Sequence, residues 1–200
     1  IRDQALALSG LLKEKIGGPS VKPYQPEKLW LELTFASEDY TPGKGDDLYR
    51  RSLYTFWRRT VAPPSMVAFD SSDREICTVN TKRTNTPLQA LNLMNDVTYV
   101  EASRKLAERI MTEGGETVEE RLAYGFRLVT ARLPGSRESS ILRQVYSDFW
   151  NDFVKDPDAA VQFLNEGESE RDESLDGVTL AAYSSVASLL LNLDEAITKE

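Results

Sequence analysis

Four helix starts follow one another from Thr86 onward, and they constrain the fold of this chain more than any other feature of the sequence. Each one offers a side chain that can accept a hydrogen bond from the first turn of a helix. Two have the T-x-x-Q or T-x-x-E pattern of a capping box, in which side chain and backbone bond reciprocally. The four starts are Thr86 with Pro87 and Gln89, Thr117 with Glu120, Ser136, and Asp156 with Pro157. Such a succession predicts an all-α body.

The spacing of apolar residues predicts how far these helices run. A long helix is expected from the cap at Thr86 to the stop at Gly114-Gly115. Its predicted buried face contains Leu88, Leu91, Met94 or Asn95, Val97 or Thr98, Ala102, Leu106 and Ile110. Residues 178–197 are apolar around much of the circumference and are expected to form one central helix. The polar run 166–176 predicts a mobile surface loop.

The first part of the chain predicts a helix followed by an extended arm. Leucines at helical spacing indicate a helix that ends near Ile16, before Gly17-Gly18-Pro19. Prolines then favour an extended crossing, and residues 27–34 are expected to form a short helix. Residues 36–47 are polar and contain glycine, which is typical of a surface loop.

Residues 48–61 are ambiguous between two regular structures. Helical spacing groups aromatic residues on one face, while alternation would make a strand, and we favour the helix. Pro63-Pro64 should end this element. Residues 65–84 are expected to be irregular, with 75–80 the one strand candidate, too isolated to build a sheet.

We therefore predict a single, mostly α domain, a bundle of about five to seven helices with a long irregular segment rich in Pro, Arg and aromatic residues and little or no sheet. Residues 1–48 form the N-terminal helix and extended arm, 49–85 the irregular Arg/aromatic segment, and 86–200 the bundle. The chain begins at Ile1 as a helix in progress, so we expect it to be the C-terminal piece of a larger protein.

Composition excludes several kinds of reaction site. The 200 residues contain no histidine and one cysteine, Cys77. This excludes Ser-His-Asp and Cys-His catalysis, HExxH zinc sites, an internal disulfide and haem attachment through CxxCH. We expect neither a metal nor a cofactor in this chain. Because no apolar run is long enough to cross a bilayer, a membrane-spanning segment is not expected either.

Charge is unevenly distributed along the chain. The net charge is −8, yet residues 49–83 hold seven Lys or Arg against three acids, whereas residues 148–200 hold three against thirteen. The acidic balance argues against a nucleic-acid partner. The basic segment has two interpretations, an anion site or a set of arginines that pair and stack within the fold.

The ligand-binding interpretation names two groups of residues. In the first, guanidinium forks and aromatic rings would grip sulfate or carboxylate groups on a polysaccharide. In the second, amides near a helix N-terminus would attract an anion, although capping alone accounts for Thr86 and Gln89. The first group is Arg50, Arg51, Tyr54, Trp57, Arg58 and Arg59, and the second is Arg83, Asn85 and Gln89.

Acidic residues offer a catalytic alternative, because glycoside hydrolysis needs two carboxylates that face one cleft and no histidine. The candidate acids are Asp46 with Asp47, Asp70 with Asp73 or Glu75, and Asp194 with Glu195. Adjacent acids more often cap helices or face solvent, so no residue is named as catalytic.

Three segments carry a resemblance to a known family. They are IRDQALALSGLLKEKIGGPSVKPYQPEKLW, LYRRSLYTFWRRTVAPPSMVAFDSSDREICTVNTKRTNTPLQALNLMND and LLLNLDEAITKE. Over essentially its whole length, the chain resembles the planctomycete-specific C-terminal domain of unknown function. It departs from the usual pattern at Val97, where a proline is expected, and at Ala196, where an aromatic residue is common.

The resemblance implies a context more than an activity. Such domains end large exported bacterial proteins, periplasmic or at the cell surface, that often carry a c-type cytochrome-like domain. Any haem would lie in that separate N-terminal domain. No catalytic residues are implied.

The sequence thus favours a non-catalytic structural or ligand-binding module. We expect it to contact companion domains of the same chain through residues 49–95 and to recognise anionic glycan. The alternatives are a histidine-free carbohydrate hydrolase or lyase, and a docking surface whose acidic C-terminal half steers a basic redox partner.

Overall fold

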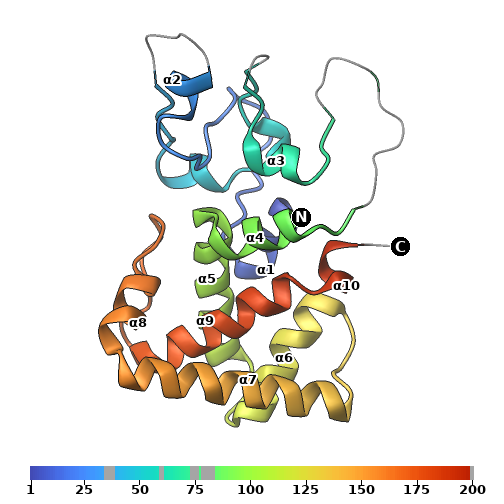
Figure 1. Cartoon of the computed structure of the whole chain (residues 1–200), viewed down its shortest axis with the longest axis vertical. Coiled ribbons are helices and arrows are strands. Elements are labelled where there is room, and N and C mark those ends of the chain that lie inside the picture. The colour runs from blue at the N-terminus through green and yellow to red at the C-terminus, as the bar shows by residue number, and fades with distance from the viewer. Residues whose placement is uncertain (34–38, 59–60, 73–76, 78–83, 199–200) are drawn as a thin grey trace.

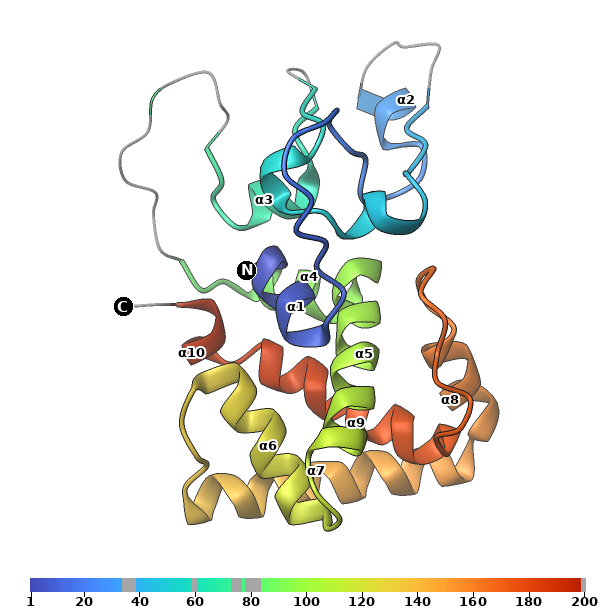
Figure 2. The same ribbon diagram turned by 180° about the vertical axis from the view of Figure 1, so that it is seen from behind.

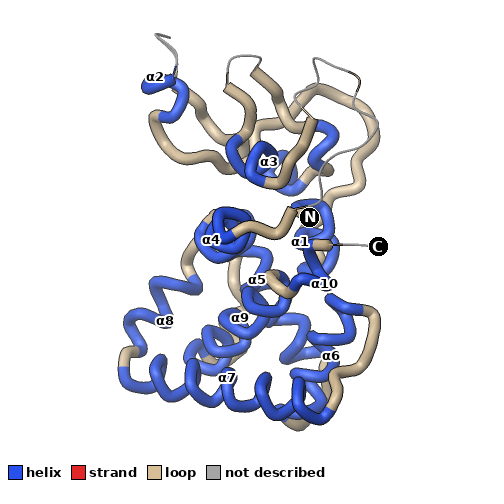
Figure 3. The backbone as a smooth tube through the Cα atoms, turned by 45° about the vertical axis from the view of Figure 1, so that its right-hand side comes forward, coloured by secondary structure: helices blue, strands red, loops and turns tan. Residues whose placement is uncertain are grey.

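The computed structural model describes the whole chain apart from residues 34–38, 59–60, 73–76, 78–83 and 199–200. It has two layers, a helical bundle and a mostly irregular layer above it, with α1 (Arg2–Ser9) and α4 (Pro87–Asn95) between them (Figure 1). Loops dominate the upper layer, and no described residue lies in a strand (Figure 3). Seven helices of the described chain have eight residues or more, so the predicted mostly α bundle is confirmed.

The centre of the bundle is formed by α5 (Val97–Glu113) and α9 (Gly177–Leu191), which pack against each other. α7 (Ser136–Lys155) and α8 (Pro157–Leu164) also cover α9, and α6 (Val118–Thr130) packs beside α5. Because α9 is covered on several sides, its apolar residues extend around the helix. Its completely buried side chains are Leu180, Ala181, Ala182, Tyr183, Ser184, Val186, Ala187 and Leu190.

The central position predicted for residues 178–197 is confirmed, but the prediction that they form one continuous helix is wrong. α9 ends at Leu191, and the short α10 (Asp194–Ile197) follows as a separate turn. Burial of each large apolar side chain of α9 contributes about 1.5–3 kcal/mol, so this helix supplies much of the stability of the bundle.

The predicted helix starts are confirmed, three of them at the residue expected. Thr86 and Thr117 both form complete capping boxes, and the Asp156 carboxylate accepts from the backbone N–H of Ala159 at 3.1 Å. The third start lies one residue earlier than predicted, because Gly135 is the N-cap and Ser136 is the first helical residue. Glu138 accepts from the Gly135 N–H at 2.7 Å and completes that helix end.

The prediction of one long helix from Thr86 to Gly114 is wrong, because the chain breaks at Asp96. This residue is extended, with φ −69° and ψ 130°, and its carboxylate accepts from the Thr98 N–H at 2.9 Å. Asp96 therefore caps a new helix, α5, instead of continuing α4. Val97 becomes the first residue of α5, a position that proline occupies readily.

The break at Asp96 changes which face of α4 is buried. Gln89 and Leu93 face the protein, while three residues predicted to be buried are exposed. Those three are Leu88, Leu91 and Met94, with 64%, 58% and 58% of their surface accessible.

The first helix ends earlier than predicted. α1 stops at Gly10, whose left-handed φ of 78° closes the helix, and not near Ile16, which is 91% exposed. α1 lies against α5, as the view from behind shows (Figure 2). Arg109 of α5 donates to the Leu8 carbonyl at 2.6 Å, so a cation satisfies the C-terminal end of α1.

The described residues of the range 48–61 do not form the predicted helix. They follow two 3₁₀ turns, η1 (Gly45–Tyr49) and η2 (Ser52–Tyr54), with extended backbone at the positions between and after them. Isolated bridges pair Lys13 with Arg50 and Val21 with Thr55. The backbone of this segment pairs with distant residues, which local helical spacing does not reveal.

Two further short helices lie in the upper layer. α2 (Leu29–Leu33) falls within the helix predicted for residues 27–34. α3 (Pro64–Ala68) begins at a proline in its first position, where irregular structure was expected from residue 65. The candidate strand 75–80 lies outside the described residues except for Cys77, which is exposed.

The loop after α8 is a surface loop, as predicted, and buried charged residues of α5 hold it. Ser169 N–H donates to Glu101 at 2.6 Å, and Arg104 donates to the Ser169 hydroxyl at 2.9 Å. Gly167 has φ 88°, and a Cβ built on it would lie 2.4 Å from the Glu101 carboxyl carbon. This position therefore needs glycine for both its conformation and its space.

Replacing Gly167 with Ala should be more costly than the same change at Gly45. Both residues have positive φ, but Cβ at Gly45 meets no atom within 4 Å. We expect Gly45→Ala to lose about 1 kcal/mol through backbone strain and Gly167→Ala about 3 kcal/mol. Urea unfolding of both variants measures the difference. Equal losses would show that the contact with Glu101 is unimportant.

Candidate ligand-binding pocket

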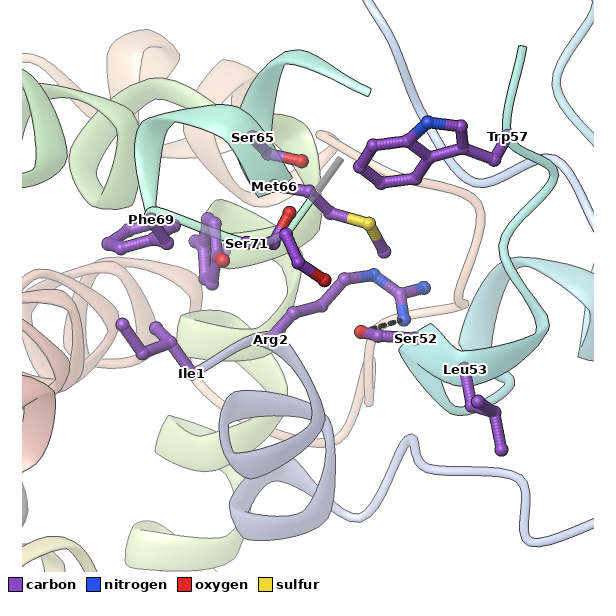
Figure 4. Close-up of a pocket in the computed structure, with 11 residues that line it drawn as sticks. Ile1, Arg2, Ser52, Leu53, Trp57, Ser65, Met66, Phe69 and Ser71 are labelled. Carbon is purple, nitrogen blue, oxygen red and sulfur yellow. Dashed lines mark hydrogen bonds between the residues drawn. The ribbon is translucent and has the colours of Figure 1, made fainter. Parts of the chain in front are cut away.

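A pocket of about 340 Å³ lies where the upper layer meets the bundle (Figure 4). The start of α1, the segment around η2, α3 with the turn that follows it, and α5 all contribute to its lining. Its lining residues are Ile1, Arg2, Ser52, Leu53, Trp57, Ser65, Met66, Phe69, Ser71, Ser72 and Tyr99. Its volume falls at the lower end of the range that binds small molecules, about 300–1,000 Å³.

One side of the pocket is mainly apolar. In Figure 4, Met66 and Phe69 project from α3 and its end, and Trp57 lies across from Phe69 with Met66 between them. Leu53 extends the apolar surface at the rim and is 68% exposed. Phe69 is fixed by an edge-to-face contact with Tyr99, whose ring centroid lies 6.1 Å away.

Arg2 forms the polar side of the pocket and is only 8% exposed. Its Nη1 donates to the Arg50 carbonyl at 2.8 Å, and its Nη2 donates to the Leu48 carbonyl at 2.6 Å. Nη1 also reaches the Ser52 hydroxyl at 3.4 Å, the contact drawn in Figure 4. Burial lowers the pKa of this guanidinium, and the Asp3 carboxylate 3.7 Å away opposes that shift.

Arg50 and Tyr54, two predicted ligand residues, are used inside the fold. Arg50 is 2% exposed, and its guanidinium donates to the carbonyls of Pro19 at 3.0 Å and Lys15 at 2.9 Å. It also lies 3.9 Å from the centroid of the Tyr54 ring. The Tyr54 hydroxyl in turn accepts from the Gly17 N–H at 2.9 Å. Both side chains thus hold the extended arm.

The other residues of the first predicted group lie in different places. The Arg51 side chain is 59% exposed, with one weak ion pair to Asp3 at 3.8 Å. Arg58 stacks over Trp30 with 4.7 Å between guanidinium carbon and ring centroid. Of the predicted residues that lie in the described part of the chain, Trp57 alone lines the pocket. Arg59 lies outside the described residues.

The second predicted group surrounds the start of α4. Asn85 donates to the Asp194 carboxylate at 2.7 Å. Gln89 completes the capping box, and its Nε2 also donates to the Ala68 carbonyl at 2.9 Å. Arg83 lies outside the described residues. The described members of the two predicted groups therefore do not come together around one site.

The pocket residues that sequence reasoning missed share one property. Arg2 lies in α1, Met66 and Phe69 lie in α3 and at its end, and Tyr99 lies in α5; none belongs to a recognisable motif. An arginine at the start of a helix gave no local signal, because its partners lie 46 to 50 residues further along the chain.

None of the candidate catalytic carboxylates that the structure describes lines this pocket. Lys13 pairs with Asp46 at 3.1 Å, and Thr84 donates to Asp70. Arg132 forms an ion pair with Glu195 at 2.6 Å. Asp73 and Glu75 lie outside the described residues. Among the described residues, no group of three or more Cys, Asp or Glu side chains has an arrangement that would hold a metal ion.

Comparison with known families places this chain. A family model described as PSD1, protein of unknown function (DUF1553), matches residues 1–146. The chain belongs to this family. The match covers the upper layer, the pocket and the bundle as far as α7. No curated protein and no solved structure matches the chain. Within the described part of this family member, no helix has both the length and the apolar character to span a membrane.

A second buried polar cluster links the extended arm to α5. The Tyr49 hydroxyl donates to the Glu101 carboxylate at 2.8 Å, and the Tyr24 hydroxyl accepts from the Glu168 N–H at 2.8 Å. Burial, reinforced by the negative charge of Glu101, raises the pKa of Tyr24 to about 12. Burial also raises the pKa of Tyr49, and its hydrogen bond to Glu101 adds to the effect. These phenols are held in their neutral form.

Replacing Arg50 with Lys should destabilise the arm, whereas the same change at the neighbouring Arg51 should not. Lysine cannot reproduce the fork that serves several carbonyls, so we expect a loss of about 1–3 kcal/mol at Arg50 and less than about 0.5 kcal/mol at Arg51. Urea unfolding gives both values, and hydrogen exchange at the Val21 amide, which bonds to the Tyr54 carbonyl at 2.8 Å, reports the arm directly. Unchanged protection in Arg50→Lys would contradict this role.

The raised tyrosine pKa values predict sensitivity to alkali. A phenol whose pKa is higher in the folded state stabilises the fold fully below its unfolded value of about 10, and that contribution is lost as pH rises. For Tyr24 the loss should extend from about pH 10 to about pH 12. Urea midpoints measured across this range should fall, and less steeply in Tyr24→Phe. A midpoint independent of pH would contradict the assignment.

Proposed function

We propose that this chain is a non-catalytic ligand-binding module that recognises anionic polysaccharide through its upper layer. The observation that carries the proposal is the open pocket beside Trp57, which presents rings and hydroxyls and has no carboxylate among its described lining residues. Concave sites with apolar walls and a few convergent polar groups are typical of ligand binding.

The distribution of charge between the layers supports an anionic ligand. Residues 1–72 carry ten Lys or Arg against nine Asp or Glu, whereas residues 84–200 carry eleven against twenty-one. The negative net charge of the bundle therefore repels an acidic polymer, whereas the upper layer has a net charge close to zero. There the exposed Arg51 lies next in sequence to Ser52 of the pocket and can hold an acidic group at its edge.

We also propose the context of the module. Its resemblance to planctomycete domains supports a bacterial protein that is exported to the periplasm or cell surface, with companion domains in the same chain. A c-type cytochrome-like domain would be one such companion and would bind its own haem. The residues of this chain that contact a companion would come from the segment 49–95, which forms much of the upper layer.

The binding proposal is tested by retention on immobilised sulfated polysaccharide. Trp57→Ala removes the ring beside the pocket and Arg51→Ala removes the exposed cation, and we expect each to weaken binding about tenfold, or 1.4 kcal/mol. Trp150→Ala and Arg137→Ala are matched controls, since both side chains are exposed on α7 of the bundle. Retention should also fall as salt rises.

Two results would count against the proposal. One is unchanged retention in both Trp57→Ala and Arg51→Ala while the variants remain folded. The other is an equal loss in the α7 controls, which would indicate contact with the polymer over the whole surface.

A further inference from the structure

Most polar groups at the base of the pocket are already engaged. Both terminal nitrogens of Arg2 donate to backbone carbonyls, and Asp3 lies 3.7 Å from the guanidinium. Asp3 itself accepts from the N–H and the hydroxyl of Ser52, at 2.7 and 2.6 Å. The positive charge of Arg2 is therefore offset by Asp3 and both of its terminal nitrogens are bonded, while its buried Nε has no partner among the described residues.

An anionic group of a ligand would gain little binding free energy at the base of the pocket, beside Arg2. It would have to leave water for a site where the nearby positive charge already has a carboxylate partner. Burial of a charge without a free partner is costly. Acidic groups of a ligand should therefore stay at the rim, near the exposed Arg51.

Apart from the Nε–H of Arg2, the groups that remain available for hydrogen bonding in the pocket are uncharged. Among the described residues, no hydrogen bond reaches the hydroxyls of Tyr99, Ser65 or Ser71. Burial raises the pKa of the Tyr99 phenol, so it stays neutral and can donate. Beside these hydroxyls, Trp57 and Phe69 provide ring surfaces.

From this combination we infer that the pocket binds an uncharged, hydroxyl-bearing ring, a neutral sugar residue. One C–H face of the ring would pack on Trp57, and its hydroxyls would bond to Tyr99, Ser65 and Ser71. The inference rests on the proposed binding function and gives the pocket and the rim different tasks. The pocket selects a neutral residue, and Arg51 holds the acidic groups that flank it.

The test uses the three tryptophans as separate reporters. The protein is labelled with 5-fluorotryptophan, and the three ¹⁹F resonances are assigned with Trp57→Phe and Trp150→Phe. Neutral disaccharides of glucose, galactose and xylose are titrated in parallel with sodium glucuronate. We expect saturable shifts of the Trp57 resonance with at least one neutral sugar and none at Trp150. The shifts should be insensitive to salt and retained in Arg51→Ala.

The substitution Tyr99→Phe gives the most specific test of the hydroxyl contacts in the pocket. It removes only a hydroxyl that pairs with no described residue, so the fold should be retained while neutral sugar binds about threefold to tenfold more weakly. Ser147→Ala on α7, where the hydroxyl bonds to the Arg143 carbonyl at 3.0 Å, is the control and should bind normally.

The outcomes separate this inference from the proposed function. Absence of a Trp57 shift with every neutral sugar, a response to glucuronate alone, or unchanged affinity in Tyr99→Phe would each overturn the neutral-sugar assignment, even if polysaccharide retention persists. Loss of retention on sulfated polysaccharide with intact neutral-sugar binding would instead remove the anionic specificity and leave the pocket assignment standing.

Discussion

The upper layer depends on buried guanidinium groups that replace regular secondary structure. Arg2 donates to the carbonyls of Leu48 and Arg50, and the Arg50 side chain in turn donates to carbonyls between Lys15 and Pro19. Buried backbone carbonyls that are not paired cost roughly 1–3 kcal/mol each, and an irregular chain has few ladder partners. The two arginines let loops pack against helices without leaving those groups unsatisfied, and the same arrangement sets the depth and charge of the pocket.

The bundle could be predicted from the sequence because its signals are local. Thr86, Thr117 and Asp156 specify helix starts within four residues, and the apolar circumference of α9 marks a central helix. Where local signals competed, the prediction failed. Asp96 can lie inside a periodic apolar pattern or cap a helix, and spacing alone does not show that the second choice wins.

The pocket could be predicted only in part. The basic segment drew attention to Trp57, which lines the pocket, but the same segment supplied Arg50, which the fold uses internally. Two other lining residues, Arg2 and Tyr99, come from α1 and α5. They reach the same pocket as Trp57 only because of how the two layers pack. Only tertiary structure separates an arginine that faces a ligand from one that faces a carbonyl.

The Glu101 carboxylate lies on the central helix α5 and links three distant parts of the chain. One of its oxygens accepts hydrogen bonds from the Tyr49 hydroxyl of the arm and from the Ser169 N–H of the loop after α8. Loosening any one of these parts exposes a charge that the other two help to shield. We therefore expect the arm and the loop to unfold together with α5, in one cooperative transition that includes the irregular layer.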